Sequence, residues 1–398
     1  MRRPWAMIAG ALLALGVSLA SAQGAGTPAA DGAWPTFKGG NARLGRGPDL
    51  GLPVKQLWKS HLGGSLYSSP AIQDGLVILG SADKHVTALE LADGKVRWSH
   101  ALPDRIWGSA PAVHGNRCYI GCVDGCMRGL ALSDGQEHGR WCGQPHGLMG
   151  KADVLSSPMI EGARLVFGSD DDFVYGVDLD GGPAWKAATG DILHDNAACA
   201  ANGTAYIPSR DGKLYALALA DGALRWSWAA PKPFNTVPST DGAAVFVGDC
   251  DSRLYALDAA TGKPRWAYTA GGRGIISSPS LGADGSVVFG STDHLVYCLE
   301  AASGALRWKA KTGDVVLSSA LLTGGLAWIG SYDGKFRALD LRTGEERWSI
   351  ELDGGVFTSA AVSGDRIVVA GRGGDVICLQ ATPPSAADAA TLPRPTRP

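Results

Sequence analysis

Eight tryptophans recur at a nearly constant step along this chain of 398 residues, and they constrain its fold more than any other feature. Successive steps are 40, 43, 44, 41, 40, 42 and 40 residues. A period near 40 residues made of short strands is typical of propeller blades with four strands each. Helical repeats are disfavoured, because no stretch beyond the first 22 residues has a convincing apolar period of 3.6 residues. The eight are Trp58, Trp98, Trp141, Trp185, Trp226, Trp266, Trp308 and Trp348.

Residues 318–348 show how one unit divides into four strands, lettered A to D from the axis outward. Strand A begins at Ser318, and strands B, C and D are expected at about 326–331, 335–341 and 345–350. Glycine in the turns between them adopts a positive φ without steric cost. An Asp recurs at the B–C hairpin tips, and we interpret it as a turn former rather than a metal ligand. These residues are Asp83, Asp124, Asp171, Asp211, Asp251, Asp293 and Asp333.

The eighth unit is divided between the two ends of the chain. Residues 356–380 supply strands A, B and C but end without a Trp, and residues 54–58 can supply the missing D strand. Pairing this N-terminal strand with the C-terminal blade closes the ring and leaves no open sheet edge. The sequence therefore predicts an all-β fold, a single eight-bladed β-propeller domain over residues 34–381.

The first 22 residues have the composition of an export signal. Arg2 and Arg3 precede an apolar stretch that reaches about Leu19, and Ala20-Ser21-Ala22 offers a cleavage site for signal peptidase. An uncleaved anchor is the alternative, which the short apolar run disfavours. We expect a periplasmic or secreted protein with no transmembrane span after signal cleavage. Residues 23–33 are predicted to be flexible, and residues 382–398 to form a disordered tail.

The net charge limits the kinds of partner that the protein can bind. Lys and Arg number 36 and Asp and Glu 38, a formal net charge of −2, and no basic block stands out. A nucleic-acid partner is therefore not expected. The first cysteine is Cys118, so a lipid anchor directly after the cleavage site is not expected either. A monomer that binds an envelope or secreted protein is favoured.

The segment from Ala256 to Trp266, with Asp258, Thr261 and Gly262 at fixed positions, resembles the tryptophan-docking motif of pyrroloquinoline-quinone-like (PQQ-like) propeller repeats. Four further segments match it almost as well: 88–98, 216–226, 298–308 and 338–348. The resemblance covers nearly all of the chain beyond the export signal and implies that each Trp docks against a neighbouring blade. It extends to the quinone-dependent alcohol dehydrogenases and to the BamB family of outer-membrane assembly proteins.

The resemblance alone does not choose between an enzyme and a scaffold, because propellers carry both. The dehydrogenases of this family carry an adjacent Cys–Cys pair on the quinone, and this sequence has no such pair. It also lacks a C-x-x-C-H haem site and long insertions between units. We therefore expect no catalytic residues, no cofactor and no metal, and a BamB-like scaffold that binds a protein or another ligand. The alternative is a quinone-dependent alcohol or sugar dehydrogenase with pyrroloquinoline quinone and calcium, and a small-molecule sensor ranks third.

Two sets of residues could form a binding site. The D-to-A connections are expected on one face together with the B–C tips, and they carry aromatic and charged side chains typical of a recognition surface, although a merely solvated rim fits as well. The candidates there are Arg105, Trp107, Lys151, His194, Asp195, Phe234, Asn235, Arg273 and Phe357. Small polar residues begin each strand A near the axis: Ser68, Ser109, Ser156, Asn196, Thr236, Ser277, Ser318 and Thr358. We interpret them as structural, and a channel that admits a ligand is the alternative.

Four of the eight cysteines cluster in the second unit: Cys118, Cys122, Cys126 and Cys142. Cys122 and Cys126 flank a hairpin tip, so we predict a disulfide between them in an exported protein. A zinc or copper site with nearby histidines is the alternative, but the spacing matches no standard zinc signature. Cys298 and Cys378 occupy a buried position of the repeat and are predicted to be core residues.

Overall fold

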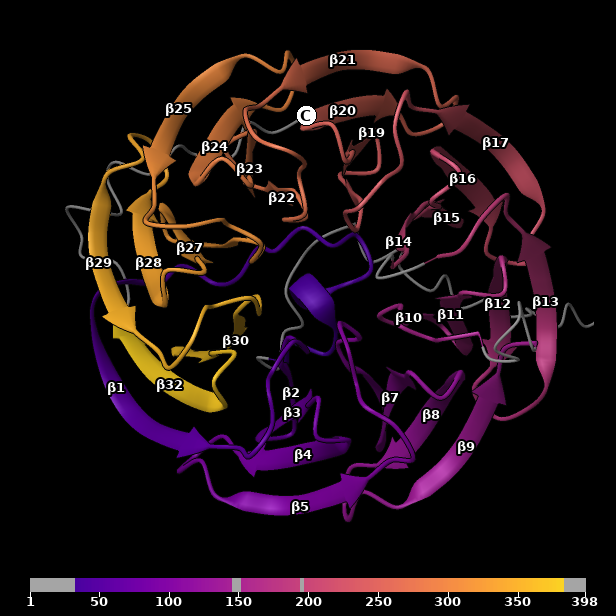
Figure 1. Cartoon of the computed structure of the whole chain (residues 1–398), viewed down its shortest axis with the longest axis horizontal. Coiled ribbons are helices and arrows are strands. Elements are labelled where there is room, and N and C mark those ends of the chain that lie inside the picture. Colours follow the sequence, from indigo (N-terminus) through magenta and orange to yellow (C-terminus); the bar gives the residue numbers. More distant parts are fainter. Residues whose placement is uncertain (1–32, 145–151, 194–196, 383–398) are drawn as a thin grey trace, which may run out of the picture.

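The computed structural model is a ring of eight antiparallel four-stranded sheets arranged as blades around a central axis (Figure 1). It describes residues 33–144, 152–193 and 197–382. The predicted export signal and C-terminal tail lie outside these residues. No helix in the described part is long and apolar enough to cross a membrane. The predicted all-β, eight-bladed propeller is confirmed.

Blades 1 to 7 use their strands in chain order from the axis outward. Blade 1 contains β2 (Ala71–Gln73), β3 (Leu76–Gly80), β4 (His85–Glu90) and β5 (Val96–Ala101); blade 2 contains β6 (Ala112–His114), β7 (Arg117–Cys122), β8 (Cys126–Ala131) and β9 (Glu137–Cys142); blade 3 contains β10 (Met159–Glu161), β11 (Arg164–Ser169), β12 (Phe173–Asp178) and β13 (Pro183–Ala188); blade 4 contains β14 (Cys199–Ala201), β15 (Thr204–Pro208), β16 (Lys213–Ala218) and β17 (Leu224–Ala229). Blade 5 contains β18 (Ser239–Thr240), β19 (Ala244–Gly248), β20 (Arg253–Asp258) and β21 (Pro264–Thr269); blade 6 contains β22 (Ser280–Leu281), β23 (Ser286–Gly290), β24 (Leu295–Glu300) and β25 (Leu306–Lys311); blade 7 contains β26 (Leu321–Thr323), β27 (Leu326–Gly330), β28 (Lys335–Asp340) and β29 (Glu346–Glu351). Blade 8 contains β30 (Ala361–Ser363), β31 (Arg366–Ala370), β32 (Asp375–Thr382) and, as its outer strand, β1 (Gly51–His61).

Blade 8 closes the ring by pairing the two ends of the propeller chain. In Figure 1 the indigo strand β1 lies outside the yellow strand β32, and Trp58 pairs with Cys378 in the antiparallel register. Lys59 Nζ lies 2.6 Å from a carboxylate oxygen of the buried Asp375. The closure predicted from residues 54–58 is thus confirmed, over a longer strand.

Burial along each blade follows from its position in the ring. Second strands such as β3 and β27 are buried at every residue, because neighbouring blades cover both faces of the sheet. In β7, β11 and β31 only the first residue, an arginine, is partly exposed. The outer strands, such as β17 and β21, alternate between more and less exposed residues, because only one face packs on a neighbour.

Seven of the recurring tryptophans donate a hydrogen bond from Nε1 to a carbonyl in the C–D turn of the next blade. Trp308, for example, lies 2.8 Å from Leu341 O. In six of these contacts the ring packs on the turn glycine: a Cβ there would lie 2.5–2.7 Å from the nearest side-chain atom, and the φ angles are +70° to +78°. Large indole rings thereby lock the spacing of neighbouring blades. The other donors are Trp58, Trp98, Trp141, Trp185, Trp226 and Trp266.

Trp348 occupies a different environment because blade 8 has no C–D turn: its third and fourth strands are opposite ends of the chain. The indole is half-buried and packs edge-on against Trp328, with ring centroids 5.9 Å apart. Among the described residues, the hydrogen bond and the glycine contact that a C–D turn gives to other tryptophans of the repeat are therefore not found at Trp348.

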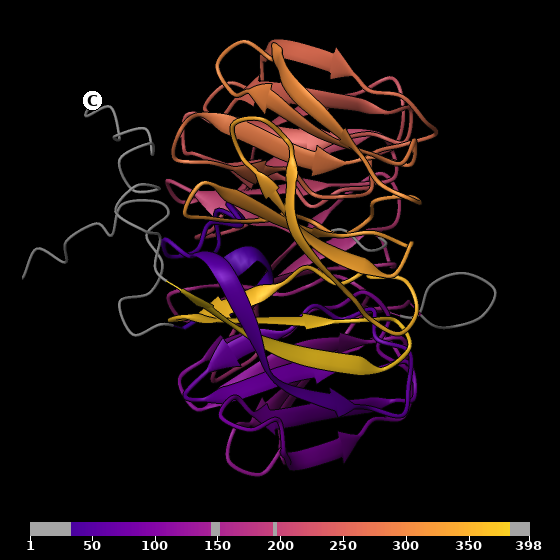
Figure 2. The same cartoon turned by 90° about the vertical axis from the view of Figure 1, so that its left-hand side faces the viewer.

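The segment from Ala33 to Leu50 crosses the axis on the face that carries the A–B hairpins. It includes the 3₁₀ turn η1 (Phe37–Gly39), which lies at the centre of the ring in Figure 1 and toward one face of the disc in Figure 2. Its backbone bonds to first strands around the ring, from the Trp34–Ile72 bridge in blade 1 to the Leu322 N–H in blade 7. This end of the axis is therefore filled by protein.

Two buried cations anchor that segment. Arg43 donates to the carbonyls of Pro158 and Ala198, and Lys38 Nζ lies 2.9 Å from Ser239 Oγ. Burial lowers the pKa of Lys38 well below its usual value and that of Arg43 to about 10. The inward-facing carbonyl dipoles of the first strands compensate part of the cost of burying these charges.

Candidate functional site

The axial residues are mainly structural. Ser69, Ser157, Ser278, Ser319 and Ser359 accept hydrogen bonds from a backbone N–H of the adjacent blade at 2.9–3.0 Å. In the row before them, Thr236 and Thr358 exchange hydrogen bonds with the second strand of their own blade. Only Ser68 and Ser277 have a buried hydroxyl without a partner among the described residues of this row, from which Asn196 is missing. Hydroxyls at the axis thus join neighbouring blades or tie the start of the first strand to the second strand of the same blade.

The opposite face, which carries the D-to-A connections and the B–C tips, holds an aromatic cluster. Tyr67 stacks on Trp107 with ring centroids 4.1 Å apart and planes inclined by 30°. Phe357 meets Tyr67 edge-on at 5.5 Å. All three side chains are half-buried, so part of each ring faces solvent. They precede the first strands of blades 1, 2 and 8 and therefore lie side by side on a rigid ring.

Two arginines lie over these rings. The guanidinium carbon of Arg105 is 5.4 Å from the Trp107 centroid. That of Arg372 is 6.0 Å from the Tyr67 centroid and 5.8 Å from that of Tyr332. We call the six residues Tyr67, Arg105, Trp107, Tyr332, Phe357 and Arg372 the aromatic arc; they come from blades 7, 8, 1 and 2. Stacked rings with guanidinium groups are typical of the energetically dominant part of a protein interface.

The predicted loop residues lie in different environments. It brings Arg105, Trp107 and Phe357 together in the aromatic arc, whereas Arg273 is exposed and makes no contact with the arc rings among the described interactions. Phe234 is only 1% exposed and packs against Trp228, so its side chain belongs to the core and not to a surface. Asn235 is half-buried beside it. Lys151, His194 and Asp195 lie outside the described residues.

Sequence reasoning missed Tyr67, Tyr332 and Arg372. Tyr67 stands directly before Ser68 just as Phe357 stands before Thr358, so the repeat register could have identified it. Tyr332 and Arg372 occupy the same place in successive B–C tips, where the recurring Asp is the most evident feature of the sequence. Comparing equivalent positions between neighbouring blades would have found all three.

The disulfide differs from the predicted one. It joins Cys126 to Cys142, whose Cα atoms are 4.0 Å apart, so the predicted Cys122–Cys126 pair is wrong. Cys126 is the cross-strand neighbour of Cys122 on β7 and of Cys142 on β9. The predicted pairing rests on the hairpin between β7 and β8 alone. Cys122 remains a thiol that donates to Asp104 O at 3.2 Å, and burial raises its pKa to about 11. Cys298 and Cys378 are fully buried, as expected.

The aspartates at the B–C tips form hydrogen bonds with groups of their own hairpin. Lys335 N–H bonds to the Asp333 carboxylate at 3.0 Å, and the same carboxylate receives Arg337. Asp211 and Asp293 likewise accept the hydroxyl of a tyrosine four residues later. No group of three or more His, Cys, Asp or Glu side chains able to hold a metal ion occurs within residues 33–144, 152–193 and 197–382.

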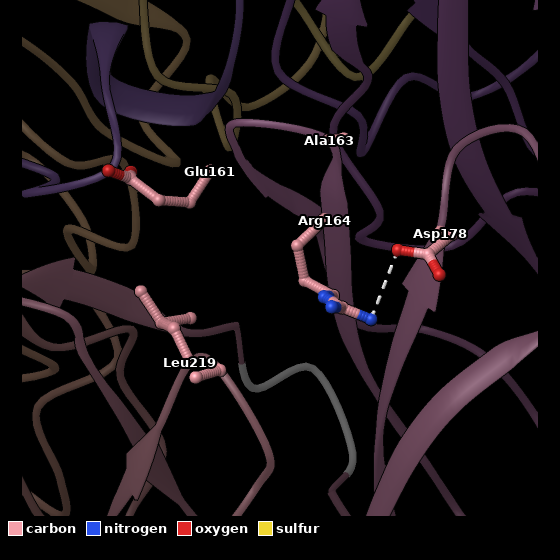
Figure 3. A pocket seen from close by; sticks show the side chains of 6 residues that line it. Glu161, Ala163, Arg164, Asp178 and Leu219 are labelled. Atoms are coloured by element: carbon pink, nitrogen blue, oxygen red, sulfur yellow. Dashed lines mark ion pairs between the residues drawn. The ribbon is translucent and has the colours of Figure 1, made fainter. Parts of the chain in front are cut away.

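An open cavity of about 280 Å³ lies between blades 3 and 4 on the face of the A–B hairpins, lined in part by Glu161, Arg164, Asp178 and Leu219 (Figure 3). Its origin is a local difference between blades. At the position equivalent to Arg164, Arg366 reaches across to a carbonyl of the next blade at 2.7 Å. Arg164 instead turns toward Asp178 at 3.1 Å and leaves the space open. Its lining thus brings the carboxylates of Glu161 and Asp178 close to the guanidinium group of Arg164.

Eight blades locked by tryptophan contacts define a propeller of the PQQ-like repeat class. Within that class, the family model described as outer membrane protein assembly factor BamB matches residues 54–170, 146–226, 170–280 and 271–397. The chain belongs to this family.

Individual relatives are distant. The chain is 25% identical over 191 residues to the outer membrane protein assembly factor BamB of Legionella pneumophila (strain Paris), a match that covers 45% of this chain and 47% of the relative. The match thus spans about half the length of that relative. The crystal structure of BamB from Moraxella catarrhalis superposes with a TM-score of 0.69 at 18% identity, over 83% of this chain and 98% of the other. A quinohemoprotein alcohol dehydrogenase from Comamonas testosteroni gives 0.75 at 12% identity, over 88% and 80%. At these identities the two structures establish the fold alone.

Proposed function

We propose that this protein is a non-catalytic docking protein of the cell envelope that binds a protein partner through the aromatic arc. The observation that carries the proposal is the stack of Tyr67 on Trp107, flanked by Phe357, on loops of a closed ring. Half-buried aromatic side chains on a rigid scaffold lose little conformational freedom when a partner covers them. Membership of the BamB family supports a place among envelope proteins. The predicted export signal at residues 1–22 supports a periplasmic or secreted location.

The second candidate is a quinone-dependent dehydrogenase, which the structural likeness to an alcohol dehydrogenase raises. A quinone with calcium needs acidic and amide ligands that converge on it. The described axial positions carry serine and threonine, several of which bond to backbone, and Lys38 and Arg43 fill one end of the axis. These residues do not fit that group, so we derive no reaction through it.

The experiment is recovery of a partner from the envelope fraction by the purified protein and two variants. Trp107→Ala removes the most extensive ring of the arc. Leu224→Ala is the matched control, because Leu224 is 57% exposed on the outer strand β17, away from the arc. We expect Trp107→Ala to lower recovery of a specific partner about tenfold, as loss of a central aromatic contact would, and Leu224→Ala to leave it unchanged.

Two results would overturn the proposal. One is undiminished partner recovery by Trp107→Ala at the same melting temperature as the wild type. The other is dye-linked oxidation of alcohols or sugars that appears when pyrroloquinoline quinone and calcium are added, which would favour the dehydrogenase.

A further inference from the structure

The arginines of the aromatic arc differ from most arginines elsewhere in the propeller. Arg128, Arg307 and Arg337 each contact two carboxylates. In contrast, no ion pair between the guanidinium of Arg105 or Arg372 and a carboxylate is found within the described residues, although the backbone N–H of Arg105 donates to the Asp104 carboxylate at 2.9 Å; both arginines are exposed. Within residues 33–144, 152–193 and 197–382, the arc therefore carries two guanidinium groups without an ion-pair partner.

The rings hold these charges in a defined place. Arg105 lies over Trp107 and Arg372 lies over Tyr67, so each ring of the stacked pair carries one guanidinium. A guanidinium that lies over a ring keeps the N–H donors in its plane free for a carboxylate. Because the rings restrict both side chains before binding, less conformational entropy is lost when a carboxylate is bound.

We infer that the aromatic arc recognises an acidic protein segment in which Asp or Glu side chains alternate with aromatic or other apolar side chains. The inference rests on the proposed function and names the partner's chemistry. Carboxylates of the segment would pair with Arg105 and Arg372, and its apolar side chains would cover Tyr67, Trp107 and Phe357. In an extended segment, successive side chains point to opposite sides and alternate ones share a face, which suits a surface of rings and charges side by side.

The breadth of the arc favours a polypeptide over a small carboxylate. Its residues come from four successive blades, and they form an open surface of half-buried rings. Tyr332 does not repel an acidic ligand electrostatically. Burial raises the pKa of its hydroxyl, so the side chain is neutral at physiological pH. An anionic membrane surface would also be attracted by two arginines, and the experiment therefore includes it as a contrary outcome.

The test measures fluorescence anisotropy of a labelled synthetic peptide in which Asp and Glu alternate with Phe and Leu. A second peptide replaces every Asp and Glu by Asn and Gln and keeps the shape. The variants are Arg105→Gln with Arg372→Gln, and Arg342→Gln as the control. Arg342 is an exposed arginine in the C–D turn of blade 7, on the opposite face.

We expect the acidic peptide to bind at least about tenfold more tightly than its amide counterpart. The double variant should lose at least about tenfold in affinity, and raising the salt concentration should weaken binding further. Arg342→Gln should bind like the wild type. All variants should keep the wild-type melting temperature, because the three arginines are exposed.

Equal binding of both peptides, or unchanged binding by the double variant, would overturn the inference. If Trp107→Ala then still abolishes partner recovery, the proposed function stands and only the acidic chemistry is wrong. Binding to vesicles of anionic phospholipid without binding to the acidic peptide would also overturn it. Failure of both the peptide and the partner experiments would reject the proposed function as well.

Discussion

Two glycines of blade 1 allow the tryptophan contact to be isolated from backbone strain. Gly75 and Gly94 have the same φ of +74°. A Cβ at Gly75 would have no atom within 4 Å. One at Gly94 would lie 2.6 Å from Cε3 of Trp58 and 2.6 Å from Ser60 Oγ, which is at the end of a rotatable side chain, whereas the indole is held in place. Replacing either by alanine therefore imposes the same left-handed backbone strain, and only Gly94→Ala pushes against the indole.

The magnitudes follow from these two contributions. An alanine in the left-handed region costs roughly 1–2 kcal/mol, which is the whole effect expected for Gly75→Ala. Forcing a methyl group into packed atoms costs roughly 1–3 kcal/mol more, so Gly94→Ala should lower the free energy of unfolding by about 2–5 kcal/mol in total. Trp58 lies on β1, so the contact also holds the closure of the ring.

Urea denaturation followed by far-ultraviolet circular dichroism measures both free energies on the same scale. The expected difference between the two variants is roughly 1–3 kcal/mol. Equal destabilisation by Gly75→Ala and Gly94→Ala would refute the account of the tryptophan contact. Gly75→Ala alone serves as the control for strain.

Three further outcomes are expected. Trp308→Ala should cost about 3–5 kcal/mol of stability in urea denaturation, as for other buried aromatics, and Trp348→Ala clearly less because blade 8 offers it no C–D turn to dock on; the reverse order would contradict the assigned docking. Alkylation of denatured, unreduced protein should label Cys122 and leave Cys142 unlabelled in peptide mapping, and Cys142→Ser should destabilise by up to about 3 kcal/mol; a labelled Cys142 would reject the pairing. Burial tends to raise the pKa of Asp375, but hydrogen bonds from Lys59 and other groups outweigh it and lower that pKa. The stability this carboxylate contributes is present above its unfolded pKa near 3.9 and is lost as pH falls through its folded value, so the stability difference between wild type and Asp375→Asn should shrink from pH 5 to pH 3; a constant difference would exclude this role.

The sequence alone predicts the propeller architecture, because the same strand and turn pattern recurs from unit to unit. In most units the Trp and the turn glycine recur at the same register, so one well-defined unit determines the others, and residues 54–58 supply the strand that the incomplete blade lacks. Packing between blades follows the same local pattern at seven of the eight junctions, as the contact of Trp308 with the turn of the next blade illustrates.

The functional surface could be predicted only in part, because it depends on which repeats deviate and how their side chains turn. The sequence identifies Arg105, Trp107 and Phe357 as loop residues. Their contact with Tyr67 depends on blades 1, 2 and 8 being neighbours in space. Phe234 occupies a similar loop and turns into the core instead. Spacing along the chain does not reveal that choice of direction.

The cysteines show a second limit. Cys126 has two cross-strand neighbours, Cys122 and Cys142, and the sequence does not indicate which of them it bonds. The segment that crosses the axis was likewise not foreseen, because its contacts are made with first strands far away in the sequence, such as that of Ala200 with Asn41.

The central claim is that a protein partner binds the aromatic arc, and site-specific photo-crosslinking tests it most directly. A photoreactive amino acid is placed at Arg105, beside Trp107, or at Arg342 in the C–D turn on the opposite face, in the exported protein within its own cells. The account predicts that irradiation joins a defined envelope protein at position 105 and not at position 342, and that Trp107→Ala removes the product. The same product at position 342, with none at position 105, would contradict the account.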